Sequence, residues 1–252
     1  MMLAKYSANG NDFVIFHALE KKDRSSLAVE LCNRQNGVGA DGLIVLIPHS
    51  EYDFEWEFYN SDGSHADMCG NGSRACAHYA YINEISSKKM SFLTGAGVIN
   101  AEVKKAHGKK KGMVLSELTK PEILEQNIEF KSSSWWKIDT GVPHMVCLVD
   151  DISEFSISTC RELRKKYNAN VNICKVNDDG SLHVRTYERG VEDETLACGT
   201  GMAACFYRAF KEGKVIDKAE VYPISKETLY LGFNGETITF KGEVVNVFNT
   251  VW

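Results

Sequence analysis

The feature that most constrains this chain is a cysteine and glycine motif that occurs twice. Asp67–Cys76 and Leu196–Cys205 share the pattern C-G-[NT]-G-x-x-A-C, and their first cysteines, Cys69 and Cys198, lie 129 positions apart. Solenoid repeats have periods of about 20–50 residues, so a repeat this long predicts two similar domains in place of a solenoid.

Other features recur at a similar separation. Apolar strand patterns follow Gly10 and Gly141, and helical patterns follow at 27–35 and 160–167. Each half therefore predicts a strand, a helix, two strands, a helix and more strands, which is an α/β (α+β) fold of two pseudo-symmetric domains. Proline and serine residues interrupt the pattern at 118–134 and place the domain boundary there. The two predicted domains are residues 1–118 and 119–243.

The chemistry of the repeated motif follows from a helix that starts at each first cysteine. The glycines let a ligand approach the backbone, and the free N–H groups of a helix start bind anions such as a carboxylate. The same field lowers the pKa of a thiol from ~8.5. Because two nearby thiols do not ionise together, Cys69 and Cys198 on opposite faces of one α-carbon would be one base and one acid. A base and an acid placed in this way are what a two-base inversion of that carbon needs.

The other cysteines are predicted to be structural. Cys76 and Cys205 each follow a motif cysteine by seven residues, or two helical turns, and are too far away to pair with it. The sequence has no C-x-x-C pair, so we predict no metal site. The remaining cysteines, which we also assign to the core, are Cys32, Cys147, Cys160 and Cys174.

Charge and hydropathy narrow the class of partner. The net charge is -5 and the pI is about 5.8, which disfavours nucleic acids and membrane surfaces as partners. No apolar run approaches the ~18 residues of a membrane span, and the N-terminal segment lacks a signal-peptide pattern. We therefore expect a cytoplasmic protein. The basic run 104–111 is predicted to be a solvated turn between strands at 91–104 and 111–117.

Three segments closely resemble the diaminopimelate epimerases: Asn9–Phe13, Tyr59–Arg74 and Glu188–Gly201. The resemblance extends from about residue 5 to about residue 245. It implies two α/β domains, each a mixed or antiparallel sheet wrapped around a central helix, with a strand near 244–252 that completes the first domain. It also implies interconversion of LL- and meso-diaminopimelate in lysine biosynthesis, which also supplies peptidoglycan precursors, without pyridoxal phosphate, any other cofactor or a metal.

The resemblance implies a role for each matching position. Cys69 and Cys198 are the acid/base pair. The backbone amides implied to hold the α-carboxylate are those of Gly70, Asn71, Gly199 and Thr200. The residues implied to bind the rest of the substrate, chiefly its distal amino-acid end, are Asn11, Asn60, Asn172, Glu188 and Arg189. His144 is implied to support the site. Val142 and Gly42 depart from polar residues found in other members.

Alternatives remain open at this point. Glu188 and Arg189 are also compatible with a surface ion pair, and His144 with an ordinary strand histidine. A proline racemase would use the same two-cysteine logic, but its substrate has no second polar end. A thiol redox sensor or zinc module would need closely spaced cysteines. The expected partner is a small-molecule substrate, with no nucleic acid and no membrane, and a homodimer is allowed.

Overall fold

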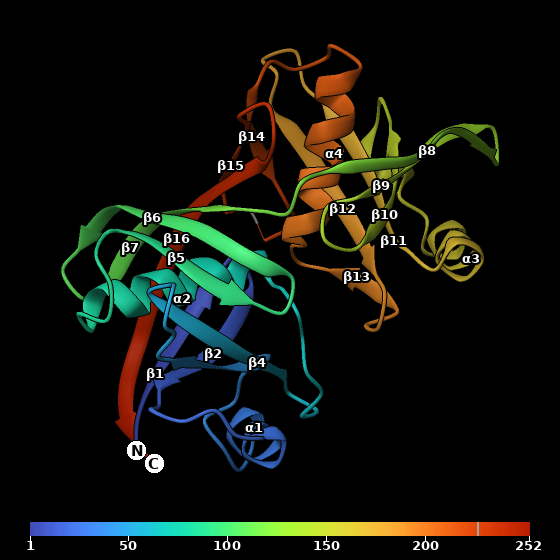
Figure 1. Ribbon diagram of the computed structural model, residues 1–252. Helices are drawn as coiled ribbons and strands as arrows, with labels where there is room; N and C mark the ends of the chain where they lie inside the picture. The colour runs from blue at the N-terminus through green and yellow to red at the C-terminus, as the bar shows by residue number, and fades with distance from the viewer. Residues whose placement is uncertain (226) are drawn as a thin grey trace. The chain divides into compact units, whose positions relative to one another are not determined.

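The computed structural model describes residues 1–225 and 227–252, which form two compact units. Unit 1 contains Met1–Glu117 and Lys241–Trp252, and unit 2 contains Leu118–Phe240. Figure 1 labels the helices and strands of both units.

Unit 1 is a closed ring of strands around a helix. In spatial order its strands are β1 (Met2–Ala8), β2 (Asn11–His17), β3 (Gly42–Ile47), β4 (Phe54–Asn60), β5 (Lys89–Thr94), β6 (Gly97–His107), β7 (Lys111–Glu117) and β16 (Ile238–Val251). Strand β16 also pairs antiparallel with β1, which closes the ring into a barrel. Closure leaves no open sheet edge in this set of strands.

Helix α2 (Gly70–Ile82) lies inside the strands of unit 1, as the teal helix of Figure 1 shows. It packs against β1, β2, β3, β6 and β7, and its residues from Gly70 to Ala80 are all buried. A helix buried on every side needs small side chains to fit. Ala75, Cys76, Ala77 and Ala80 supply them. A second helix, α1 (Ser25–Cys32), packs against β2, β3 and β4.

Unit 2 repeats this plan with a more open sheet. In spatial order its strands are β15 (Leu229–Phe233), β14 (Lys218–Tyr222), β12 (Leu182–Glu188), β11 (Asn170–Val176), β10 (Pro143–Leu148), β9 (Ser133–Asp139) and β8 (Glu122–Phe130), with β13 (Asp193–Thr195) paired to β12. Helix α4 (Gly199–Lys211) packs against β9, β10, β11, β12 and β15. Helix α3 (Ile157–Tyr167) packs against β10, β11 and β12, and the short helix η1 (Ile152–Glu154) precedes it.

The pairing of the strands confirms the predicted pseudo-symmetric fold class. The pairs β2–β3 and β10–β11 are both parallel, and β3–β4 and β11–β12 are both antiparallel. The pairs β4–β5 and β12–β14 are again parallel, followed by the antiparallel pairs β5–β6 and β14–β15. Helices α1 and α3 occupy equivalent places in this order, and so do α2 and α4.

The structure departs from the sequence expectations in two places. The segment 118–134, where the domain boundary was expected, contains strand β8, which pairs with β9 through two irregularities of register that hide its alternation. The single strand expected at 91–104 is two strands, β5 and β6, because the chain turns at Gly95 and Ala96. The solvated turn in the basic run is confirmed at residues 108–110, between β6 and β7.

Candidate active site

Cys69 is the residue at which helix α2 begins. It is the N-cap residue, with an extended backbone (φ -149°, ψ 117°), and its Sγ atom accepts a hydrogen bond from the backbone N–H of Gly72 at 3.4 Å. An N-cap side chain normally satisfies one of the donors that a helix start leaves free. The sulfur of Cys69 therefore lies among the first N–H groups of α2, where negative charge is favoured.

Cys198 occupies the same position in helix α4. Its backbone is also extended (φ -122°, ψ 110°), and its side chain is buried. Its Sγ atom lies 3.5 Å from the hydroxyl oxygen of Thr200. The two cysteines of the repeated motif are thus the N-caps of equivalent helices.

The predicted carboxylate-binding amides lie in the first turns of these two helices. In α2 the backbone N–H of Ser73 donates to the carbonyl of Cys69, and in α4 the backbone N–H of Met202 donates to the carbonyl of Cys198. The preceding amides of a helix have no partner within it and are available to a ligand. The four predicted residues of this kind are Gly70, Asn71, Gly199 and Thr200.

In unit 1 the start of α2 is held by a network of amides and charges. The side-chain amide of Asn71 donates to Oδ1 of Asn11 at 2.7 Å, and Asn11 donates in turn to a carboxylate oxygen of Asp41 at 3.2 Å. The guanidinium of Arg74, which is fully buried, donates to Oδ1 of Asn71 at 2.8 Å. Asn71 therefore uses its side chain within the unit and leaves its backbone amide for the predicted contact.

In unit 2 the start of α4 is held by a neutral histidine. His144 is fully buried, and burial together with the nearby charge of Arg189 lowers its pKa to about 3. At neutral pH the imidazole is therefore uncharged. Its Nε2 atom lies 3.0 Å from the hydroxyl oxygen of Thr200, which in turn contacts Sγ of Cys198. The structure thus connects His144 to one of the two predicted catalytic cysteines.

Asn172 lies beneath this histidine and is also fully buried. Its side-chain nitrogen is 3.1 Å from Nδ1 of His144 and donates to the carbonyl oxygen of Met145 at 3.0 Å. Its side-chain oxygen accepts from the hydroxyl of Thr186 at 2.8 Å. The predicted substrate-binding role of Asn172 would require a rearrangement, because the whole amide is occupied by protein groups.

The other predicted substrate residues lie at the ends of strands. Glu188 is the last residue of β12, and both it and Arg189 are half-buried. The backbone N–H of Arg189 donates to Oδ1 of Asn170 at 2.7 Å, and its guanidinium donates to the carbonyl of Asn168 at 3.1 Å. Asn60 ends β4 and donates to the hydroxyl of Ser64 at 2.9 Å.

In unit 1, sequence reasoning missed Asp41 and Arg74, and in unit 2 it missed two further residues. Asn170 holds the Arg189 turn, and Thr186 holds the amide of Asn172. The asparagines at 170 and 172 alternate on β11 and so share one face of the strand. That alternation of two polar residues in a buried strand was the available signal.

The remaining cysteines behave as core residues. Burial raises the pKa of the Cys147 thiol to about 11 and that of Cys160 to about 12. Burial also raises the thiol pKa values of Cys76 and Cys205 well above the ordinary value. A protonated, buried thiol is a poor nucleophile and a poor base.

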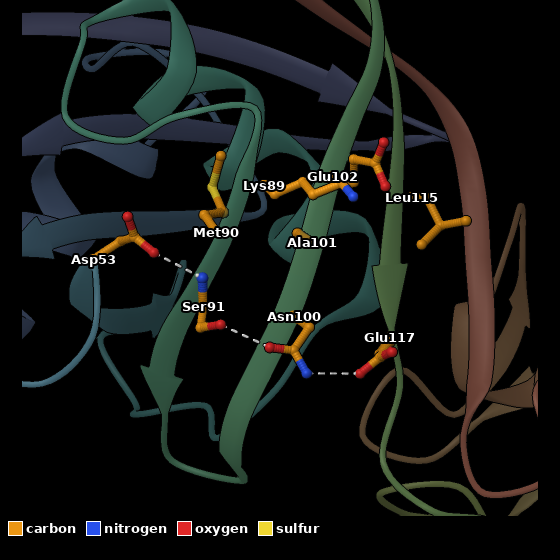
Figure 2. Close-up of a pocket in the computed structure, with 9 residues that line it drawn as sticks. All are labelled: Asp53, Lys89, Met90, Ser91, Asn100, Ala101, Glu102, Leu115 and Glu117. Atoms are coloured by element: carbon orange, nitrogen blue, oxygen red, sulfur yellow. Dashed lines mark hydrogen bonds between the residues drawn. The ribbon is translucent and has the colours of Figure 1, made fainter.

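A hollow of about 370 Å³ lies elsewhere, over strands β5, β6 and β7 of unit 1 (Figure 2). Figure 2 shows a chain of hydrogen bonds across it, from Asp53 through Ser91 and Asn100 to Glu117, with lengths of 2.7–2.9 Å. Asp53 and Asn100 are exposed and Ser91 and Glu117 are half-buried, and Ser91 contributes both its backbone N–H and its hydroxyl. None of the predicted site residues lines this hollow.

Within 1–225 and 227–252, no three or more His, Cys, Asp or Glu side chains are grouped so that they could hold a metal ion. In the same part of the chain, no helix combines the length and the apolar character that crossing a membrane requires.

Comparison with solved structures shows the fold. A phenazine biosynthesis protein from Bacillus anthracis superposes with a TM-score of 0.74 at 14% identity, over 99% of this chain and 98% of that one. A probable proline racemase from Agrobacterium radiobacter gives a TM-score of 0.75 at 13% identity, over 100% of this chain and 92% of that one. At such low identity the likeness concerns the architecture alone.

Comparison of sequences shows the family. The family model described as diaminopimelate epimerase matches residues 3–124 and 137–230. A diaminopimelate epimerase from Nitratiruptor is 59% identical over 99% of this chain and 98% of its own length. One from Campylobacter lari is 56% identical over 97% and 96%, and one from Helicobacter pylori is 41% identical over 97% and 93%. With matches of this strength along nearly the whole sequence, the chain belongs to the diaminopimelate epimerase family of isomerases.

Proposed function

We propose that Cys69 and Cys198 are the acid and the base of a cofactor-independent epimerisation. The observation that carries the proposal is their equivalence: each is the extended N-cap residue of the buried central helix of its unit. One cysteine takes the α-proton as a thiolate, and the other delivers a proton to the opposite face as a thiol. Inversion follows because the proton leaves from one side and arrives from the other.

Each helix start contributes to the same carboxylate in this proposal. The amides of Gly70 and Asn71 in α2, and of Gly199 and Thr200 in α4, donate to the α-carboxylate. Negative charge develops on that group as the α-proton leaves, so fixed N–H donors stabilise the transition state more than the ground state. The two units are then the two halves of one enzyme, and each supplies one cysteine.

The substrate proposed is diaminopimelate, which the curated relatives carry in their names. Its distal end is a second zwitterion, and a guanidinium and a carboxylate match the two charges of that group. Arg189 and Glu188 are the residues proposed for this contact, with Asn11 and Asn60 as further polar partners. The activity places the protein in lysine biosynthesis, and we propose a cytoplasmic location.

A homodimer through strands β1 and β16 is part of the proposal. Met2 and Val251 pair across these strands and are 67% and 73% exposed, and Phe248 and Trp252 are exposed nearby in the chain. Neighbouring exposed apolar side chains are typical of a surface that another protein covers. Analytical ultracentrifugation of the wild type and of Phe248→Lys tests this: a dimer that the substitution dissociates supports it, and a monomeric wild type contradicts it.

The reaction is tested by incubating the purified protein with LL-diaminopimelate and separating the stereoisomers by chiral chromatography. Formation of the meso isomer without added pyridoxal phosphate or metal is the expected result. L-Proline serves as the comparison substrate. Racemisation of proline with no conversion of diaminopimelate would favour the racemase alternative.

A further inference from the structure

The strand residues that lie beneath the first turn of the central helix differ between the two units. Strand register makes Ile44 in β3 the equivalent of Asn172 in β11, because they pair with Ile15 in β2 and Val146 in β10 respectively. Across the next strand, Ile44 pairs with Phe58, and Asn172 pairs with Thr186. Unit 1 thus has an apolar pair where unit 2 has a polar one.

The same comparison extends to the histidine. His144 is the first paired residue after Pro143 in β10, and its equivalent in β2 is Phe13, which is also buried. Burial of hydrogen-bonding groups adds less to stability than burial of hydrocarbon of the same shape. Apolar side chains fill the equivalent positions in unit 1. The polar side chains of unit 2 therefore have a reason other than stability.

The directions of the hydrogen bonds supply that reason. The carbonyl of Met145 can only accept, so the side-chain nitrogen of Asn172 must face it, and the same nitrogen then donates to Nδ1 of His144. The hydroxyl of Thr186 donates to the side-chain oxygen of Asn172 and completes its set of partners. An imidazole that accepts at Nδ1 and is uncharged carries its proton on Nε2.

The tautomer of His144 determines whether Sγ of Cys198 receives a hydrogen bond. Nε2–H of His144 donates to the hydroxyl oxygen of Thr200 at 3.0 Å. The hydroxyl hydrogen of Thr200 is then free to point at Sγ of Cys198, 3.5 Å away. A donated hydrogen bond stabilises a thiolate more than a thiol. With the proton on Nδ1 instead, Nε2 would accept that hydrogen and the sulfur would lose it.

We propose that Asn172 and Thr186 are positioning residues, which act on Cys198 by selecting the Nε2–H tautomer of His144. The proposal rests on the acid/base role proposed above for Cys198. It assigns Asn172 an action through His144 in place of a direct contact with the substrate. Thr186 supports Asn172, because the buried amide oxygen would otherwise lack a partner.

The test combines a spectroscopic and a kinetic measurement on the full-length protein. Protein labelled with [¹⁵N]histidine is examined by long-range ¹H–¹⁵N correlation, with the His144 signals assigned by their loss in His144→Gln. Wild type should show an unprotonated Nδ1 and a protonated Nε2. In Asn172→Asp the side chain has no N–H, so Nδ1 should become the protonated nitrogen. The kcat for diaminopimelate should fall by about tenfold or more, with KM changed by less than about twofold.

Thr186→Val and Thr186→Ser form the matched pair. Valine keeps the shape and removes the hydroxyl, so kcat should fall about 2- to 10-fold, the range for one neutral hydrogen bond. Serine keeps the hydroxyl and should stay within about twofold of wild type. Circular dichroism melting curves establish that each variant is folded before its kinetics are compared.

Two outcomes would overturn the proposal. One is an unchanged His144 tautomer in Asn172→Asp. The other is a rise in KM with kcat unchanged, which would make Asn172 a substrate ligand. The tautomer is measured without substrate, so it also separates this proposal from the proposed function. A tautomer change in a protein that never epimerises diaminopimelate would support the positioning role and contradict the reaction.

Discussion

The side-chain oxygen of Asn172 lies so close to Gly201 that a Cβ atom on that glycine would be only 2.3 Å from it. Gly201 is in the first turn of α4, two residues after its first helical residue. The glycine therefore lets α4 begin directly above the buried amide. Because Asn172 is held on all sides, it cannot move aside as a flexible side chain would.

The first prediction follows from this contact. Gly201→Ala should lower the free energy of unfolding by about 1–3 kcal/mol, the usual cost of overpacking a buried site. Gly72→Ala is the matched control in unit 1. There the nearest atom to the added Cβ is the terminal methyl carbon of Ile44 at 3.2 Å, which can shift, so the cost should be smaller. Urea denaturation measures both. Equal losses would mean that the Asn172 contact is not the determining one.

The second prediction concerns pH and the buried histidines. Burial lowers the pKa of His78 to about 4, and burial with the charge of Arg189 lowers that of His144 to about 3. An unfolded histidine binds a proton below about pH 6.5, which the folded protein does not do until pH 4 or lower. Above pH 6.5 these two histidines therefore do not reduce the free energy of unfolding. As the pH falls from 6.5 toward 4, protonation of the unfolded chain lowers that free energy.

His78→Gln removes one of these two titrating histidines, at a position outside the candidate site. Between pH 6 and pH 5 the variant should lose about 1 kcal/mol less stability than wild type, since one fewer histidine is protonated on unfolding. Above pH 7.5 the free energies of unfolding of the variant and of wild type should change with pH in the same way. Urea unfolding at each pH provides the measurement, and identical losses in the acid range would show that His78 binds its proton in the folded state.

The third prediction concerns the cysteines individually. Cys69→Ser and Cys198→Ser each replace an acid/base group by a hydroxyl whose pKa is far too high. Each should lower epimerisation by at least ~100-fold, the lower range for a positioned acid or base. Cys76→Ser and Cys205→Ser, which alter buried thiols two helical turns further on, are the controls. Their effect should appear in thermal stability first, and turnover of folded protein should remain.

The fourth prediction concerns specificity. Arg189→Met keeps much of the volume of the side chain and removes its charge. Diaminopimelate should bind at least roughly tenfold more weakly, because a hydrogen bond to a charged group contributes ~1.5–3 kcal/mol. Lysine has the distal ammonium but no distal carboxylate, so its slow α-proton exchange should be affected much less. The preference for diaminopimelate over lysine should therefore narrow.

The control for that substitution is Arg164→Met. Arg164 pairs with Glu192 in the neighbouring turn, with 2.9 Å between Nε and a carboxylate oxygen. Removal of this surface pair should leave the substrate preference unchanged. Rates of α-proton exchange for both substrates in all three proteins decide the matter. An unchanged ratio in Arg189→Met would place Arg189 outside the distal pocket.

Much of the fold could be predicted from local patterns. The repeat of C-G-x-G placed both central helices to within a residue or two. Strand β8 was missed because its register shifts twice against β9, and irregular pairing erases the alternation that marks a strand. The turn within 91–104 was missed although it contains Gly95 and is followed by Gly97.

The site was predictable only in part, for a physical reason. The motif cysteines could be identified from the residues next to them in the chain. Thr186 and Asn170 act through partners 14 and 19 positions away, so only the folded strands bring them into contact. The same holds for Asn172, whose polar side chain suggested a ligand contact. Its complete burial emerges only when β10, β11 and β12 are assembled.

The central claim is that one group removes the α-proton and a second group delivers a proton to the opposite face. It is tested most directly by running the reaction from LL-diaminopimelate in D₂O and analysing both isomers by mass spectrometry at low conversion. The account predicts that the meso product carries solvent deuterium at the inverted carbon, while the recovered LL substrate carries almost none. Meso product that retains the original protium, or equal labelling of both isomers from the start, would indicate a single base and would contradict the pairing of Cys69 with Cys198.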